Sequence, residues 1–137
     1  MQECLEDLFT LVKIHIDIDN EMFSPMFYEH LPIPDFQEQY YKSRYVLNEI
    51  ERLFEKVNEQ RADRNVLKCF RDYLIFFLAS SSKLAEMAYE LHFRTLDESE
   101  LSNDEAARLF NEYKSNERHR LAEGEKLNKM IYSLYQQ

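Results

Sequence analysis

Four residues of this 137-residue chain carry the side chains best suited to binding a metal ion. His15 and Asp19 are four positions apart, a spacing that places both on one face of a helix. His30 and His92 fall in segments that an alternating helical bundle would bring to the same end. Because imidazole and carboxylate groups bind zinc, iron and manganese, His15, Asp19, His30 and His92 define a hypothetical site for a transition metal ion.

A simpler interpretation of the histidines is preferred, in which His15 and His92 are partly buried and hydrogen-bonded to neighbouring acids. None of the four histidines has a glutamate three positions before it, and ferritin-like di-metal sites draw on such Glu-x-x-His pairs. We therefore expect no cofactor, and the metal ion remains the alternative.

Polar residues also interrupt the inward face of the last predicted helix. Glu117 and Arg120 fall on this face, and antiparallel packing would bring Glu117 near Ser80 and Ser81. Because burying an unpaired charge is costly, we expect Glu117, Arg120 and Ser81 to form an inward polar layer that fixes the register. Gly124 would let the helix approach Leu74 closely. A small polar cavity with Glu117 as general acid or base is the functional alternative, and no catalytic residue is assigned.

Acidic residues are concentrated in two segments of a chain whose net charge is −9. Residues 1–35 hold eight acids and one base, and residues 95–105 hold five acids and no base. Acids at helix N-termini and on soluble surfaces account for part of this pattern. If the helices alternate in direction, however, the two segments meet and form one negative pole. Such a pole would attract a basic surface of another protein and repel nucleic acid. The residues expected to contact the partner are Asp17, Glu21, Glu29, Asp97, Glu98 and Glu100.

The spacing of apolar residues predicts helices almost throughout the chain. The expected helices cover residues 2–23, 35–58, 64–94 and 102–135. They predict an all-α, antiparallel up-down-up-down four-helix bundle that forms a single domain over residues 1–137. Asp35 and Ser102 are the expected N-caps of the second and fourth helices. Because residues 59–65 lack both glycine and proline, a continuous second and third helix in a domain-swapped dimer is the alternative.

The same periodicity predicts which faces of the helices are buried and which are left for partners. The inward residues expected on the first helix are Leu5, Leu8, Phe9, Val12, Ile16 and Phe23. Those expected on the last helix are Phe110, Tyr113, Leu121 and Ile131. Apolar residues off the buried faces suggest an interface for self-association or partner docking. The expected interface residues are Ile75, Phe76, Leu78, Tyr41 and Tyr45.

Composition narrows the class of protein further. The chain has a single glycine, whereas phosphate-binding loops and dinucleotide fingerprints require several, so the sequence contains neither motif. The N-terminal residues do not resemble a signal peptide, and no apolar run is long enough to span a membrane. Cys4 and Cys69 are therefore expected to be buried, reduced thiols of a cytoplasmic protein.

These observations favour a non-enzymatic, acidic protein–protein interaction module that docks on a basic partner protein, of an inhibitor, immunity or regulatory type. The first alternative is a metal-binding helical bundle with His and Asp ligands at one end. The second is a structural homodimer or assembly subunit.

Overall fold

A computed structural model describes residues 1–23, 36–96 and 103–135 of the chain. These residues form four helices and no strand: α1 (Gln2–Phe23), α3 (Gln37–Asn58), α4 (Arg64–Leu96) and α5 (Asn103–Tyr135). The all-α prediction is confirmed, and every helix begins and ends within two residues of its predicted position. Phe36 occupies the N-cap position of α3 without a side-chain cap, while Asp35 and Ser102 lie outside the described residues. In the part of the chain described, no helix is both long and apolar enough to cross a membrane.

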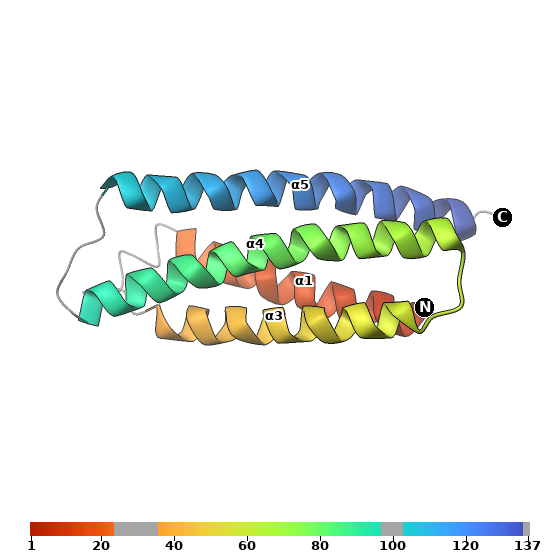
Figure 1. Cartoon of the computed structure of the whole chain (residues 1–137), viewed down its shortest axis with the longest axis horizontal. Helices are drawn as coiled ribbons and strands as arrows, with labels where there is room; N and C mark the ends of the chain where they lie inside the picture. The colour runs from red at the N-terminus through yellow and green to blue at the C-terminus, as the bar shows by residue number, and fades with distance from the viewer. Residues whose placement is uncertain (24–35, 97–102, 136–137) are drawn as a thin grey trace.

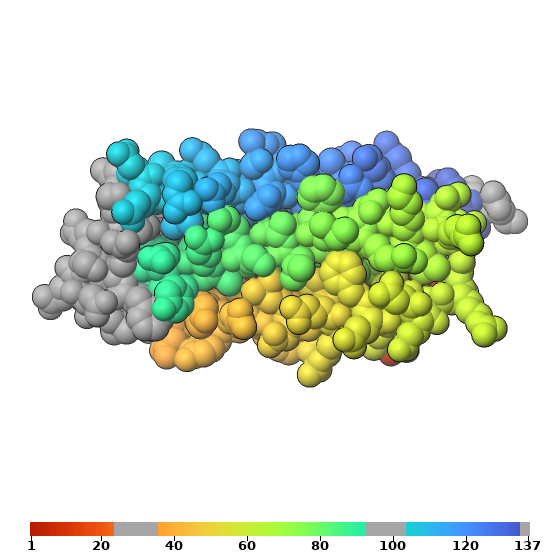
Figure 2. Space-filling model, viewed as in Figure 1, coloured from red at the N-terminus to blue at the C-terminus, as the bar shows by residue number. Residues whose placement is uncertain are grey.

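Successive helices run in opposite directions, as Figure 1 shows by the colour along each ribbon. Lys56 near the end of α3 pairs with Glu3 at the start of α1, and Lys42 near the start of α3 pairs with Glu21 at the end of α1. These two pairs fix α1 and α3 as antiparallel. Figure 2 shows that α4 lies between α3 and α5 on one face of the bundle.

The turn between α3 and α4 forms without glycine or proline. The carboxylate of Asp63 accepts hydrogen bonds from the backbone N–H groups of Asn65, at 2.9 Å, and Val66, at 3.2 Å. This is the geometry of an N-cap, in which a side-chain oxygen satisfies the N–H groups of the first helical turn. The cap starts α4 at Arg64, so the alternative of one continuous helix over α3 and α4 does not hold.

The buried face of α1 differs from the predicted one. Phe9 is 61% exposed and Ile16 is 44% exposed, although both were expected to point inward. Ile18, which is not among the expected inward residues, is in the core. The buried residues of α1 are Cys4, Leu5, Leu8, Leu11, His15, Ile18 and Met22. Apolar residues cover more than half of the circumference of α1. Periodicity alone therefore does not decide which of two neighbouring faces of the helix is buried.

The buried face of α5 also differs from the predicted one, as if the helix were rotated about its axis. Phe110 and Leu121 are exposed, whereas Leu109, Arg120 and Leu127 are buried together with Tyr113. Among the described residues, no Cα atom of α1 lies within 8 Å of a Cα atom of α5. The backbones of α1 and α5 are therefore not closely packed against each other, and the two helices are connected only through side chains.

Candidate functional site

A buried polar network joins α1, α4 and α5 around the carboxylate of Glu117. Arg120 donates to both carboxylate oxygens, from Nε at 2.7 Å and from Nη2 at 2.9 Å. His15 Nε2 lies 2.8 Å from Glu117 Oε1, and the Ser80 hydroxyl donates to the same oxygen. Arg120 also donates from Nη1 to the Tyr73 hydroxyl at 2.9 Å. Three helices thus supply partners to one carboxylate.

The hydrogen bonds keep Glu117 ionised. Burial by itself would raise the pKa of Glu117, but hydrogen bonds from Arg120, His15 and Ser80 outweigh it and hold the pKa well below the ordinary value. An ionised carboxylate can only accept hydrogen bonds, so His15 Nε2 carries the proton that faces Glu117. A carboxylate with so low a pKa is a poor general base near neutral pH.

A second part of the network lies nearer the end of α1. The buried Tyr113 hydroxyl donates to Asp19 and lies 3.4 Å from His15 Nε2. Ser81 Oγ lies 3.3 Å from His15 Nδ1, where the neutral ring can accept its proton. Burial raises the pKa of Tyr113, and the nearby Glu117 and Asp19 charges raise it further. The phenol therefore remains a proton donor.

The network includes the three residues expected to form the inward polar layer, Glu117, Arg120 and Ser81, and adds partners that sequence reasoning missed. Those partners are His15, Asp19, Tyr73 and Tyr113, while the contact of Ser80 with Glu117 was expected from antiparallel packing. His15 is buried and bonded to the carboxylate of Glu117, in agreement with the preferred interpretation of this histidine, but its spacing from Asp19 does not reveal which carboxylate it contacts. Gly124 faces the Tyr73 ring instead of Leu74, and a Cβ atom there would lie 3.2 Å from Tyr73 Cε2.

The four candidate metal ligands are not brought together in the described part of the chain. His15 and Asp19 are engaged by Glu117 and Tyr113, and His30 lies outside the described residues. His92 is eleven residues beyond Ser81 on α4, or about 16 Å along the helix axis from the level of His15. Over residues 1–23, 36–96 and 103–135, no group of three or more His, Cys, Asp or Glu side chains could hold a metal ion. Cys4 and Cys69 are buried free thiols, and burial raises the pKa of each.

A different set of expected residues does converge, on the surface between α1 and α3. Asp17 and Ile14 of α1, with Tyr41, Lys42 and Tyr45 of α3, line a hollow of about 420 Å³. Tyr41 is 61% exposed and Tyr45 is 52% exposed. Two residues expected at an interface and one expected to contact a partner therefore line the same hollow. Four of the other acids expected to contact a partner lie outside the described residues: Glu29, Asp97, Glu98 and Glu100. Glu21 is described and pairs with Lys42.

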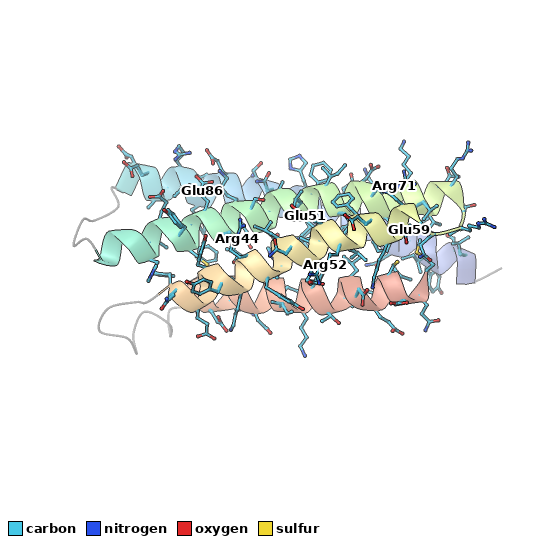
Figure 3. All side chains as sticks on the ribbon, turned by 60° about the horizontal axis from the view of Figure 1, so that its bottom comes forward. Arg44, Glu51, Arg52, Glu59, Arg71 and Glu86 are labelled. Carbon is cyan, nitrogen blue, oxygen red and sulfur yellow. The ribbon has the colours of Figure 1, made fainter. Side chains whose placement is uncertain are left out.

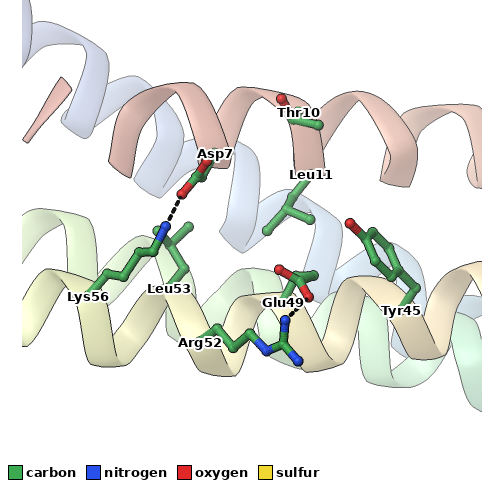
Figure 4. A pocket seen from close by; sticks show the side chains of 8 residues that line it. All are labelled: Asp7, Thr10, Leu11, Tyr45, Glu49, Arg52, Leu53 and Lys56. Atoms are coloured by element: carbon green, nitrogen blue, oxygen red, sulfur yellow. Dashed lines mark hydrogen bonds and ion pairs between the residues drawn. The ribbon is translucent and has the colours of Figure 1, made fainter. Parts of the chain in front are cut away.

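A second hollow, of about 260 Å³, continues along the same two helices. Tyr45 lines both hollows, and Figure 4 shows it beside Glu49 on α3, opposite Asp7, Thr10 and Leu11 of α1. We call the two hollows together the α1–α3 groove. Figure 3 shows these helices side by side.

Carboxylates outnumber cations when the residues that line the α1–α3 groove are counted together with their ion-pair partners. Each cation along it is paired: Lys42 with Glu21 and Glu38, Arg52 with Glu49, and Lys56 with Glu3 and Asp7. The hydrogen bonds that Lys42 donates to Glu38 and Glu21 raise its pKa, so Lys42 remains charged. The side chain of Asp17 has no hydrogen bond or ion pair to any described residue. Three carboxylates and three cations line the two hollows, and the cations pair with three further carboxylates beside them, Glu3, Glu21 and Glu38.

The other expected interface residues do not form one exposed patch. Ile75 is 55% exposed on α4, but Leu78 packs against the core. Phe76 is half-buried and stacks on the ring of His119, with centroids 5.3 Å apart. Ile75 is thus the exposed member of this group.

Two buried serines provide a stability test with opposite signs. Ser43 Oγ is buried without a hydrogen-bond partner in the described structure, whereas Ser80 donates to Glu117. We expect Ser43→Ala to stabilise the protein by about 0.5–1 kcal/mol, because alanine favours a helix and removes an unsatisfied hydroxyl. Ser80→Ala should destabilise it by about 1–2 kcal/mol. Urea unfolding of both variants at pH 7 checks the pair, and destabilisation by Ser43→Ala would show that its hydroxyl has a partner.

With this geometry established, the chain was compared with models of protein families, with curated proteins and with solved structures, and none of the three comparisons found a match.

Proposed function

We propose that this protein is a non-enzymatic interaction module that binds a basic segment of a partner protein in the α1–α3 groove. The observation that carries the proposal is the hollow in which the exposed rings of Tyr41 and Tyr45 lie beside the unpaired carboxylate of Asp17. Tyrosine is enriched among the residues that dominate binding energy at protein interfaces. A cytoplasmic location and an inhibitory or regulatory role belong to the same proposal.

The chemistry of the groove favours arginine and lysine side chains on the partner. A guanidinium group can stack on an exposed tyrosine ring and form an ion pair with an adjacent carboxylate. The cations of the groove are already paired, so its surplus charge remains available to an incoming base. Long-range attraction would also steer a basic partner toward a molecule of net charge −9.

A labelled octa-arginine peptide is the first probe, because it reports binding to the groove before a natural partner is known. The test variant is Asp17→Asn combined with Tyr41→Ala. The matched control is Glu51→Gln combined with Tyr132→Ala, which removes one exposed acid and one exposed tyrosine elsewhere. Glu51 is labelled on α3 in Figure 3.

We expect the Asp17/Tyr41 variant to weaken peptide binding at least about tenfold, as loss of a central interface residue does, and the control to weaken it less than about threefold. Wild-type binding should weaken strongly between 50 and 500 mM salt, because exposed charges are screened. Fluorescence polarisation measures both effects. Equal weakening in the two variants would show general attraction to an acidic protein, and affinity that is insensitive to salt would contradict the electrostatic account.

A further inference from the structure

The open side of the bundle between α1 and α5 contains a cavity that the proposed function does not use. Side chains bridge the two helices near the end of α1, through His15 with Glu117 and through Tyr113 with Asp19. Toward the start of α1 the bridge ends and a cavity of about 340 Å³ begins. This volume lies within the range of small-molecule sites.

The walls of this cavity are mainly apolar. Leu8 and Val12 of α1 face Leu127 of α5, and Phe9 and Leu121 lie at the rim with more than half of each side chain exposed. At Gly124 the absence of a side chain leaves the Tyr73 ring as part of the lining. The cavity is open because Phe9 and Leu121, expected to point inward, turn outward.

The polar part of the lining consists of the guanidinium of Arg120, which is 4% exposed, the buried hydroxyl of Tyr73 that accepts from it, and the exposed side chains of Glu125 and Asn128. A guanidinium has five N–H groups. Arg120 uses three, two toward Glu117 and one toward Tyr73, and it lies 5.8 Å from the Phe77 ring centroid. Its other two N–H groups have no acceptor among the described residues. Buried donors without acceptors are costly, so an acceptor in the cavity would gain a charge-assisted hydrogen bond.

We propose that the α1–α5 cavity is a binding site for a small, uncharged, apolar carbonyl compound, whose oxygen accepts hydrogen bonds from Arg120. The ligand is uncharged because Glu117 already balances the charge of Arg120, and a carboxylate would place a second anion beside it. Its apolar body lies against Leu8, Val12 and Leu127. The site is separate from the α1–α3 groove, so either proposal can fail without the other.

Three matched probes test the proposal on the full chain by methyl NMR titration. Acetophenone carries the carbonyl, isopropylbenzene has a methyl group in place of the oxygen, and benzoate has a carboxylate. We expect acetophenone to shift the signals of Leu8, Val12 and Leu127 and to bind at least about tenfold more tightly than isopropylbenzene, because hydrogen bonds to charged groups are the stronger class. Equal affinity would overturn the role of Arg120. Tighter binding of benzoate would overturn the assignment to an uncharged ligand.

Cavity-filling variants locate the site. Val12→Phe fills the cavity from α1, and Ile14→Phe is its matched control because Ile14 lines the α1–α3 groove on the same helix. We expect Val12→Phe to abolish acetophenone binding and Ile14→Phe to leave it unchanged. If Val12→Phe does not fold, Asn128→Phe narrows the same cavity from its exposed rim. Undiminished binding to the folded filling variant would overturn the proposed location.

Discussion

Replacing Arg120 with methionine is expected to lower the free energy of unfolding by about 3–5 kcal/mol, because it leaves the buried Glu117 carboxylate without its main partner. The side chains of Arg120 and Glu117 are 5% and 13% exposed, and the Tyr73 hydroxyl loses its donor as well. For a chain of this length the loss corresponds to a fall in Tm of roughly 10–15 °C. Urea unfolding at pH 7 and a thermal melt measure the effect.

The α5 helix offers a matched control for this substitution. Lys126 pairs with Glu123 at the same three-residue spacing as Arg120 with Glu117, but Lys126 is largely exposed. Lys126→Met should cost no more than about 0.5 kcal/mol, as exposed ion pairs contribute little. Adding Glu117→Gln to Arg120→Met removes the carboxylate that Arg120→Met leaves without its main partner. The double variant should therefore recover part of the lost free energy of unfolding. A loss from Arg120→Met no larger than that from Lys126→Met would show that the network does not stabilise the bundle.

Lowering the pH should destabilise the protein through the same carboxylate. The pKa of Glu117 in the folded protein lies well below that of an unfolded glutamate, because bonds from Arg120, His15 and Ser80 outweigh its burial. A depressed pKa gives stability that is complete above the unfolded pKa, near 4.3, and is lost as pH falls through the folded pKa. We expect the free energy of unfolding to fall by about 2 kcal/mol or more below pH 4.5 on account of this group.

Glu117→Gln separates this contribution from the protonation of other acids. The variant should be less stable than wild type at pH 7, because Arg120 loses its counter-charge, yet its stability should fall less steeply between pH 5 and pH 2.5. Glu125→Gln, which makes the same change at an exposed site on the same helix, controls for the loss of one carboxylate. Denaturant unfolding at several pH values measures both slopes. Parallel pH profiles for wild type and Glu117→Gln would exclude Glu117 as the source of the acid sensitivity.

Much of the fold could be predicted because it depends on local patterns. The four helices and the turn near residue 60 follow from apolar spacing and from the polar run at 59–65. The buried residues of α4 could also be predicted from the sequence, because its apolar arc is centred on a run that includes Phe70, Leu74 and Phe77. The N-cap at Asp63 is a local signal that was overlooked.

The candidate sites were harder to predict from the sequence than the helices. Asp17, Tyr41 and Tyr45 were each singled out, but no local pattern indicates that residues of α1 and α3 line one hollow. His15 and Asp19 were identified as a pair, but their partners are about a hundred residues away on α5. The carboxylate that engages His15 could be assigned only once the rotation of α5 was known.

Helix periodicity and charge are properties of neighbouring residues, so the order of the amino acids alone predicts the four helices and the two strongly acidic segments. Which arc of α1 and of α5 is buried follows only from the packing of the helices. Both helices carry apolar residues on adjoining faces, so the choice depended on packing against α4 and on pairing the charges of Glu117, Arg120 and their neighbours. That choice leaves Phe9 and Leu121 exposed and opens the cavity between the first and last helices.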